Sequence, residues 1–323
     1  MTQTYPLRFE NNFHHTIWGG HRLELLKGLP QGTTPVGESW EVSGLAASPS
    51  VVRNGPLAGL TLDEVIRHWG PALLGQHIFR RYRGQCPLLV KFIDAASDLS
   101  VQVHPDDALA ARRHGASGKT EMWYVIDAEP GASLLLGLRD PLTQDDYTRR
   151  VADGTIIDAL ARHAVQRGDV FYIPAGRIHS ICGGIMVCEI QQSSDITYRL
   201  WDYGRLGLDG RPRLLHTELA REAIDFTVHN DYRTPYDRTA AVATLIDSPY
   251  FVTTLLNVDT SVERQLESAD SCVTLTCLEG SARATTAAGH TVELPKGSSC
   301  LIPAIDAHFT VEGHAKLLEA WAK

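Results

Sequence analysis

The sequence predicts a mainly β protein of sandwich or jelly-roll type, with a few inserted helices. Short runs rich in Val, Ile, Leu, Tyr and Thr, bounded by Gly, Pro and Asp, are typical of strands. We expect such strands over residues 88–93, 122–126, 170–173, 185–190, 251–256 and 273–278. Helical patterns are few and do not alternate regularly with these runs, which disfavours a doubly wound parallel sheet.

Three segments have the apolar spacing of helices and carry Asp or Glu near their first turn. They cover residues 62–83, residues 143–149 together with 156–162, and residues 217–224. Because the flanking segments predict strands, we expect these helices as insertions in a β scaffold.

A similar phrase occurs twice in the chain, which indicates an internal repeat. The first copy is Gly168-x5-Pro174-x-Gly176-x2-His179, and the second is Gly297-x5-Pro303-x4-His308. The polar stretch 225–239 lies between the copies. We therefore predict one domain over residues 1–235, with a helical insertion near 62–83, and a second domain over residues 236–323.

Composition and charge exclude several classes of protein. The 323 residues are 43% apolar and 21% charged, close to the average of globular domains, which excludes disordered, collagen-like and coiled-coil chains. Lys and Arg number 30 against 38 Asp and Glu, so the net charge is -8. This balance disfavours nucleic acid as a partner, and it requires any anionic ligand to be small and locally held.

The six cysteines include no C-x-x-C pair, and we expect them to be reduced and buried rather than disulfide-bonded. The N-terminus lacks the basic and then apolar build of a signal peptide. No apolar stretch approaches the roughly 18 residues of a membrane span. We expect a cytoplasmic protein without a membrane partner.

Four side chains with metal-binding chemistry form the most informative pattern. Gln102 and His104 are two residues apart on an expected strand, so both side chains leave the same face. Glu121 begins another expected strand, and His179 ends the first copy of the repeated phrase. Converging donors of this kind suit zinc, or manganese, iron or cobalt. The second copy has no upstream Gln-x-His, so we expect its barrel to lack this chemistry.

Several long phrases resemble type I phosphomannose isomerase in its short bacterial form, a family of the cupin superfamily. They are SVQVHPDD, GKTEMWYVI, GDVFYIPAGRIHSI and DITYRLWDYGR, with GESWEVS and LVKFIDA upstream. The resemblance implies a bicupin of two jelly-roll barrels and interconversion of mannose 6-phosphate and fructose 6-phosphate. It also implies one Zn²⁺ per chain, held by Gln102, His104, Glu121 and His179.

Aldose-ketose isomerisation moves a proton between C1 and C2 through an enediol, so the site needs a proton carrier and positive charge near the oxygens. Arg199 matches the family's active-site arginine, and its permanent charge suits an enediolate or a phosphate. Lys119 lies two residues before Glu121 and therefore on the same side of an extended strand. We expect it to act as a catalytic or substrate-orienting group.

Further residues in the family phrases are candidates for the substrate pocket. We expect Glu189 and Asp195 there from the segment that leads to Arg199, and Ser100 and Lys91 as groups that help to hold the phosphate. Trp18 and Glu41 are candidates from the N-terminal phrases.

Other functions stay open at this point. A cupin isomerase acting on another sugar, a non-catalytic sugar-binding cupin and a metal-dependent dioxygenase all fit a metal-binding barrel. A phosphate loop is rejected, because the segment ending in Gly118-Lys119-Thr120 has Arg113 where that motif needs its first glycine. No G-x-G-x-x-G follows a predicted strand. These patterns do not determine the oligomeric state, the physiological metal or the group that moves the proton.

Overall fold

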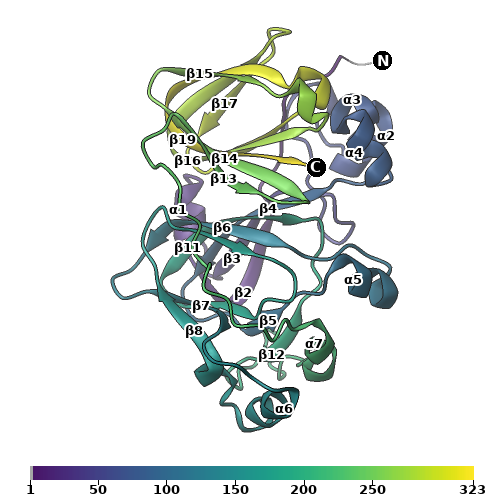
Figure 1. The fold of residues 1–323 in the computed structure, drawn as a ribbon. Coiled ribbons are helices and arrows are strands. Elements are labelled where there is room, and N and C mark those ends of the chain that lie inside the picture. Colours follow the sequence, from purple (N-terminus) through teal and green to yellow (C-terminus); the bar gives the residue numbers. More distant parts are fainter. Residues whose placement is uncertain (1–2) are drawn as a thin grey trace.

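Two antiparallel β-barrels dominate this computed structural model, which describes residues 3–323 (Figure 1). The first barrel contains a six-stranded sheet in the order β2-β3-β4-β11-β6-β9 and a five-stranded sheet in the order β12-β5-β10-β7-β8. The six-stranded sheet consists of β2 (Phe13–Gly20), β3 (Val36–Val42), β4 (Leu88–Ala95), β11 (Ile185–Gln192), β6 (Glu121–Ala128) and β9 (Val170–Ile173). The five-stranded sheet consists of β12 (Tyr198–Trp201), β5 (Val101–Val103), β10 (His179–Ile181), β7 (Ser133–Leu138) and β8 (Leu160–Ala164).

The second barrel is a single eight-stranded sheet with the path β1-β18-β16-β19-β14-β13, to which β15 and β17 are added. Its strands are β13 (Val242–Asp247), β14 (Phe251–Val258), β15 (Ser261–Gln265), β16 (Val273–Thr286), β17 (Thr291–Pro295), β18 (Ser299–Ile302) and β19 (His308–Ala322). The N-terminal strand β1 (Leu7–Arg8) crosses over to pair with β18. The predicted domain division between residues 235 and 236 stays a prediction.

The six predicted strands are confirmed, because each lies within β4, β6, β9, β11, β14 or β16. The mainly β prediction with two barrels and inserted helices is therefore confirmed for the fold. The helices are α1 (Arg22–Leu26), α2 (Leu62–Trp69), α3 (Pro71–Leu74), α4 (Gln76–Arg81), α5 (Asp107–His114), α6 (Gln144–Asp153) and α7 (Thr217–Ala223). The sequence patterns had not indicated α1 and α5.

The segment 62–83 forms three short helices instead of one. Helix α2 begins with a capping box between Thr61 and Glu64, and it ends at Gly70, whose φ of 54° is left-handed. Gly75 ends α3 with φ 89° and ψ 153°, a conformation that glycine adopts readily and other residues rarely. The carboxylate of Asp270, from the second barrel, then accepts the backbone N–H groups of Gln76 and His77 at 2.8 and 2.6 Å. The insertion therefore packs against the second barrel.

The prediction of helix over residues 156–162 is wrong. Residues Ile156–Ala159 form a short 3-10 turn, and Leu160–Ala164 form strand β8. Pairing with β7 decides the conformation, since Ser133 lies opposite Ala164 and Leu138 opposite Leu160. Tertiary pairing here outweighs a weak local helical spacing.

An apolar layer holds the two barrels together. One hydrophobic cluster contains Phe92 of the six-stranded sheet, Ile66 of the helical insertion and Phe251 of the second barrel. A separate cluster around Trp123 lies within the first barrel. All six cysteines are buried and free, as the sequence predicts. Within residues 3–323, no helix is both long enough and apolar enough to cross a membrane.

The two copies of the repeated phrase take the same strand register. In the first barrel His179 of β10 pairs with Gln102 of β5, and in the second barrel His308 of β19 pairs with Gln265 of β15. Two residues further on, Glu267 stands where the first barrel has a histidine. The internal repeat inferred from the sequence thus corresponds to equivalent positions in two barrels.

We predict that Gly75→Ala lowers the free energy of unfolding by about 3 kcal/mol, because it adds strain and a clash. A Cβ at this position would lie 1.8 Å from the backbone oxygen of Asp270. Gly115→Ala is the matched control, since Gly115 has φ 63° with nothing within 4 Å of its Cβ position. This control should cost only about 1 kcal/mol. Urea unfolding followed by tryptophan fluorescence measures both, and equal losses would contradict the prediction.

Candidate metal centre

The candidate metal centre combines side chains from the two sheets of the first barrel. Gln102 lies on β5, and His104 follows the end of that strand. His179 is the first residue of β10, and its pairing with Gln102 brings the two side chains to one place. Glu121 is the first residue of β6 in the other sheet. Strand pairing and the facing of two sheets therefore bring together residues up to 77 positions apart.

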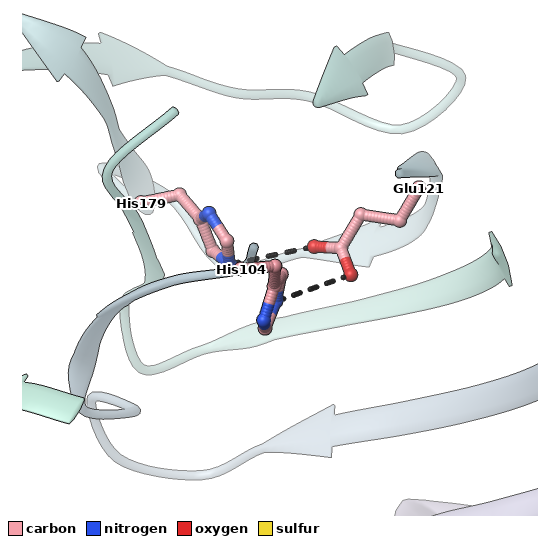
Figure 2. Close-up of side chains that lie close together, drawn as sticks. All are labelled: His104, Glu121 and His179. Atoms are coloured by element: carbon pink, nitrogen blue, oxygen red, sulfur yellow. Dashed lines mark ion pairs between the residues drawn. The ribbon is translucent and has the colours of Figure 1, made fainter. Parts of the chain in front are cut away.

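The three ionisable donors converge closely, as Figure 2 shows. One ligand atom from each of His104, Glu121 and His179 lies within 4.8 Å of the others. The two carboxylate oxygens of Glu121 are each 3.4 Å from one histidine Nε2, Oε2 from His104 and Oε1 from His179. All three side chains are no more than 1% exposed. In so dry a cluster the carboxylate charge is costly unless positive charge lies near it.

Backbone carbonyls hold both imidazole rings in the orientation that a metal needs. The Nδ1 of His104 lies 2.9 Å from the oxygen of Ile196, and the Nδ1 of His179 lies 2.9 Å from the oxygen of Arg177. Because a carbonyl only accepts, each Nδ1 carries the proton and donates. Each Nε2 then carries a lone pair directed into the cluster, where Lys119 Nζ lies 3.0 Å from that of His104 and Gln102 Nε2 lies 3.2 Å from that of His179. Metal-binding histidines likewise donate their other ring nitrogen to a carbonyl.

The arrangement of donors fits a bound metal ion. Neither carboxylate oxygen of the fully buried Glu121 accepts a well-formed hydrogen bond, which is costly unless a cation is near. The ammonium group of Lys119 lies 2.8 Å from Oε2 of Glu121 and 3.0 Å from Nε2 of His104. A positive charge is thus already placed against the same two donors. Two imidazoles and a carboxylate are the donor types that zinc and related divalent metals take.

The protonation states also suit metal binding. Burial, with help from the charge of Lys119, lowers the pKa of His104 to about 3, and burial lowers the pKa of His179. Burial alone would raise the pKa of Glu121, but Lys119 and the histidines hold it well below its usual value. The histidines are therefore neutral and the glutamate is ionised near neutral pH, which are the forms that coordinate metals.

Gln102 lies beside this cluster. Its Nε2 is 3.2 Å from Nε2 of His179, and its Oε1 accepts a hydrogen bond of 3.3 Å from Ser100. The side chain is therefore in place next to the three ionisable donors, and its role as a fourth ligand stays a prediction.

A cavity adjoins the cluster and contains most of the residues expected in the substrate pocket. Those that line it are Trp18, Lys91, Ser100, Gln102, Lys119, His179, Glu189 and Arg199. The cavity brings together residues from both sheets and from the segment after β12, so the structure places these candidates in one site. Their individual roles stay predictions.

One wall of the cavity is a buried chain of charges. The Nζ of Lys91 lies 3.4 Å from a carboxylate oxygen of Glu38 and 3.4 Å from one of Glu189. It also lies 4.9 Å from the centre of the Trp40 ring. Glu189 accepts a hydrogen bond of 2.9 Å from Nε1 of Trp123. Burial would lower the pKa of Lys91, but the two carboxylates outweigh it and raise that pKa.

Arg199 also lines the cavity. Its Nε donates to Ser100 Oγ at 3.2 Å, and its Nη1 donates to the carbonyl of Leu214 at 2.9 Å. Burial lowers the pKa of Arg199, and the neighbouring charge of Arg213 lowers it further. A guanidinium that is desolvated beside another cation favours an anionic ligand.

Two predicted pocket residues lie elsewhere. Glu41 accepts hydrogen bonds from Lys27 at 2.6 Å and from Ser299 at 3.2 Å, and it lines a different cavity between the barrels. Asp195 is exposed and does not line the cavity beside the metal cluster. Neither residue lines the cavity beside the metal cluster, and their assignment to the substrate pocket stays a prediction that this placement does not favour.

The cavity also contains residues that the sequence analysis missed, among them Glu38, Trp123, Thr197 and Arg213. Glu38 belongs to the same phrase as Glu41, and the alternation of a strand could have separated the two, since they are an odd number of residues apart. Arg213 lies in an irregular loop, where no spacing rule applies.

Comparison with known proteins agrees with the resemblance seen in the sequence. Residues 7–129 match the family model "Phosphomannose isomerase type I, catalytic domain", and residues 241–320 match "Mannose-6-phosphate isomerase, cupin domain". The chain is 37% identical to "Probable mannose-6-phosphate isomerase GmuF" of Bacillus subtilis over 98% of both proteins. It is 36% identical to a mannose-6-phosphate isomerase of Streptococcus mutans over 80% of this chain and 81% of that protein.

Solved structures share the same architecture. A crystal structure of the mannose 6-phosphate isomerase from Bacillus subtilis superposes with a TM-score of 0.88 at 30% identity, covering 98% of this chain and 99% of that one. A structure of a putative mannosephosphate isomerase from Archaeoglobus fulgidus gives a TM-score of 0.81 at 22% identity over 99% and 98%, which supports the fold alone. With its bicupin fold and its relatives along nearly the whole length, this chain belongs to the type I mannose-6-phosphate isomerase family.

Proposed function

We propose that this protein interconverts mannose 6-phosphate and fructose 6-phosphate, and that it uses one zinc ion per chain. The single observation that carries the proposal is the buried cluster of His104, Glu121 and His179 beside a cavity lined by charged side chains. The names of the relatives supply the substrate pair.

Zinc suits the donors, because two neutral imidazoles and a carboxylate leave room for the amide of Gln102 and for a substrate oxygen. When bound, the metal would supply Lewis-acid stabilisation to substrate oxygens that become anionic. A dioxygenase would need the same donors to hold redox-active iron, so bound iron and oxygen consumption are its distinguishing signs.

The chain's own residues have separate tasks in this proposal. Lys119, held at the junction of the metal ligands and the cavity, moves or positions a proton near the reacting carbons. Arg199 stabilises an anionic oxygen of the enediol-forming substrate or its phosphate with a charge that is always present. Trp18 and Ile93 form an apolar part of the cavity wall and help to exclude water.

The first prediction is that the purified protein converts mannose 6-phosphate to fructose 6-phosphate, loses this activity after treatment with a chelator, and regains it with Zn²⁺. A coupled assay for fructose 6-phosphate measures the rate, and metal analysis measures occupancy. If folded, zinc-loaded protein shows no turnover, the substrate assignment fails, and other sugars or a sugar-binding role take its place.

We further predict that His104→Ala and His179→Ala each reduce metal occupancy at least about tenfold, because each removes a ligand and leaves the cluster incomplete. His163→Ala, which alters a histidine of the same sheet on β8, should retain its metal. Metal content after gel filtration tests this, with circular dichroism to establish that the barrels are folded. Full metal content in both cluster variants would contradict the assignment.

Arg199→Ala should behave differently from the ligand variants, because the arginine lies outside the metal donors. We expect it to keep the metal and to lose turnover by about 10²–10³-fold, the usual cost of removing a charge stabiliser at a reacting centre. Turnover unchanged within twofold would show that this arginine has no part in the reaction.

A matched pair of variants tests which glutamate of the phrase GESWEVS belongs to the substrate pocket. Glu38→Gln alters the wall of the cavity and should lower kcat/KM, since Lys91 loses one of its two carboxylate partners there. Glu41→Gln leaves the buried Lys27 without its partner and should instead lower stability by about 3 kcal/mol with little change in kcat/KM. If Glu41→Gln lowered kcat/KM and Glu38→Gln did not, Glu41 would belong to the pocket in place of Glu38.

A further inference from the structure

A hairpin-like segment joins β12 to α7 beside the cavity, and we call residues 203–215 the arm. It begins with two residues in the left-handed region, Tyr203 and Gly204, whose φ angles are 57° and 67°. A β-bridge between Leu206 and Pro212 closes the arm, and the N–H of Gly207 donates to the backbone oxygen of Arg211. The arm therefore has a defined conformation despite its lack of regular secondary structure.

The arm lies at the entrance to the cavity. Its tip, residues 207–209, lines a groove together with residues 15–18 of β2. This groove and the cavity beside the metal cluster share three lining residues, Trp18, Glu38 and Arg213. Arg213 is thus the residue of the arm that reaches both the outer groove and the cavity.

Positive charge accumulates where the arm meets β12. Asp202 pairs with Arg205 at 2.5 Å and with Arg213 at 3.2 Å, and its side chain is only 4% exposed. Arg199 is tied to the arm through the carbonyl of Leu214, and within residues 3–323 it has no carboxylate partner. Two of the three guanidinium groups therefore share the carboxylate of Asp202 and that of Arg199 has none, which leaves an excess of about two positive charges among these four side chains.

The donors that remain match a phosphate group. Asp202 contacts Arg213 through Nη1, so the other side of the guanidinium fork is left for a ligand in the cavity. Arg199 uses Nε and Nη1 within the protein and leaves Nη2. Two arginines with planar forks are suited to hold the oxygens of a dianion, and a phosphate would balance the excess charge.

We propose that Arg213 binds the phosphate group of the substrate together with Arg199, and that the arm thereby selects phosphorylated over unphosphorylated sugars. The proposal rests on the proposed sugar-phosphate isomerase function. It adds a specificity-determining residue, and it gives the irregular arm a role in recognition at the mouth of the cavity.

Steady-state kinetics with mannose 6-phosphate give the first test, using Arg213→Ala, Arg213→Lys and the control Arg211→Ala. Arg211 is exposed on the same arm and does not line the cavity. Loss of a charged hydrogen bond to phosphate should raise KM roughly 10- to 100-fold in Arg213→Ala, while kcat stays within about threefold. Arg213→Lys should recover part of the loss, and Arg211→Ala should match the wild type.

Binding of inorganic phosphate, measured by calorimetry on the zinc-loaded protein, provides a test that does not depend on turnover. Phosphate affinity should fall at least about tenfold in Arg213→Ala and remain unchanged in Arg211→Ala. If the wild type binds phosphate in this way but turns over no mannose 6-phosphate, the proposed function fails while the phosphate site stands. Unchanged KM and phosphate affinity in a folded Arg213→Ala protein would show that Arg213 serves only to hold Asp202, and would overturn the proposal.

Discussion

The pairing of β10 with β5 is the constraint on which the site depends. It places His179 opposite Gln102 and leaves His104 just beyond the strand end, so the donors of the five-stranded sheet meet at one edge. The six-stranded sheet completes the cluster, because β6 begins with Glu121. A shift of one residue between β5 and β10 would turn every second side chain to the other face and disperse the donors. The convergence of these donors is thus a consequence of register.

The second barrel shows that the same register is compatible with a site of a different kind. Gln265 and His308 repeat the pairing, but Val273 begins the strand that corresponds to β6 and joins an apolar cluster. His308 is 39% exposed and pairs with Glu263 at the surface. A buried carboxylate of this barrel, Glu319, is already paired with Arg264 at 2.9 Å and accepts a hydrogen bond of 2.6 Å from Thr254. Within residues 3–323, the group of His, Cys, Asp and Glu donors that could hold a metal ion lies in the first barrel, while the second barrel packs around an apolar cluster.

Sequence patterns predicted the strands because strands depend on short-range order, and they singled out His104, Glu121 and His179, which the structure brings together. Strand runs alternate or stay apolar over a few residues, and the repeated phrase marks the turn that precedes His179. The predictions failed where contacts with residues distant in the sequence determine the local conformation. Residues 160–164 form a strand by pairing with β7. The helix over 62–83 is broken at Gly70 and at Gly75, the second of which lies against Asp270 of the second barrel. Glu41 was expected in the pocket but lines another cavity, because a resemblance identifies a phrase and not the face of the strand. Arg213 was missed because it lies in a loop that spacing rules do not describe.

A continuous path of polar contacts joins the arm to the metal donors. The carbonyl of Leu214 holds Arg199, and Arg199 donates to Ser100. Ser100 in turn donates to Gln102, whose amide lies 3.2 Å from His179. An anion that engages Arg199 would therefore act on the group that orients Gln102. In a chain of hydrogen bonds each bond polarises the next, so a change at one end affects the other. We therefore expect anion binding at Arg199 and the geometry of the metal cluster to be energetically coupled.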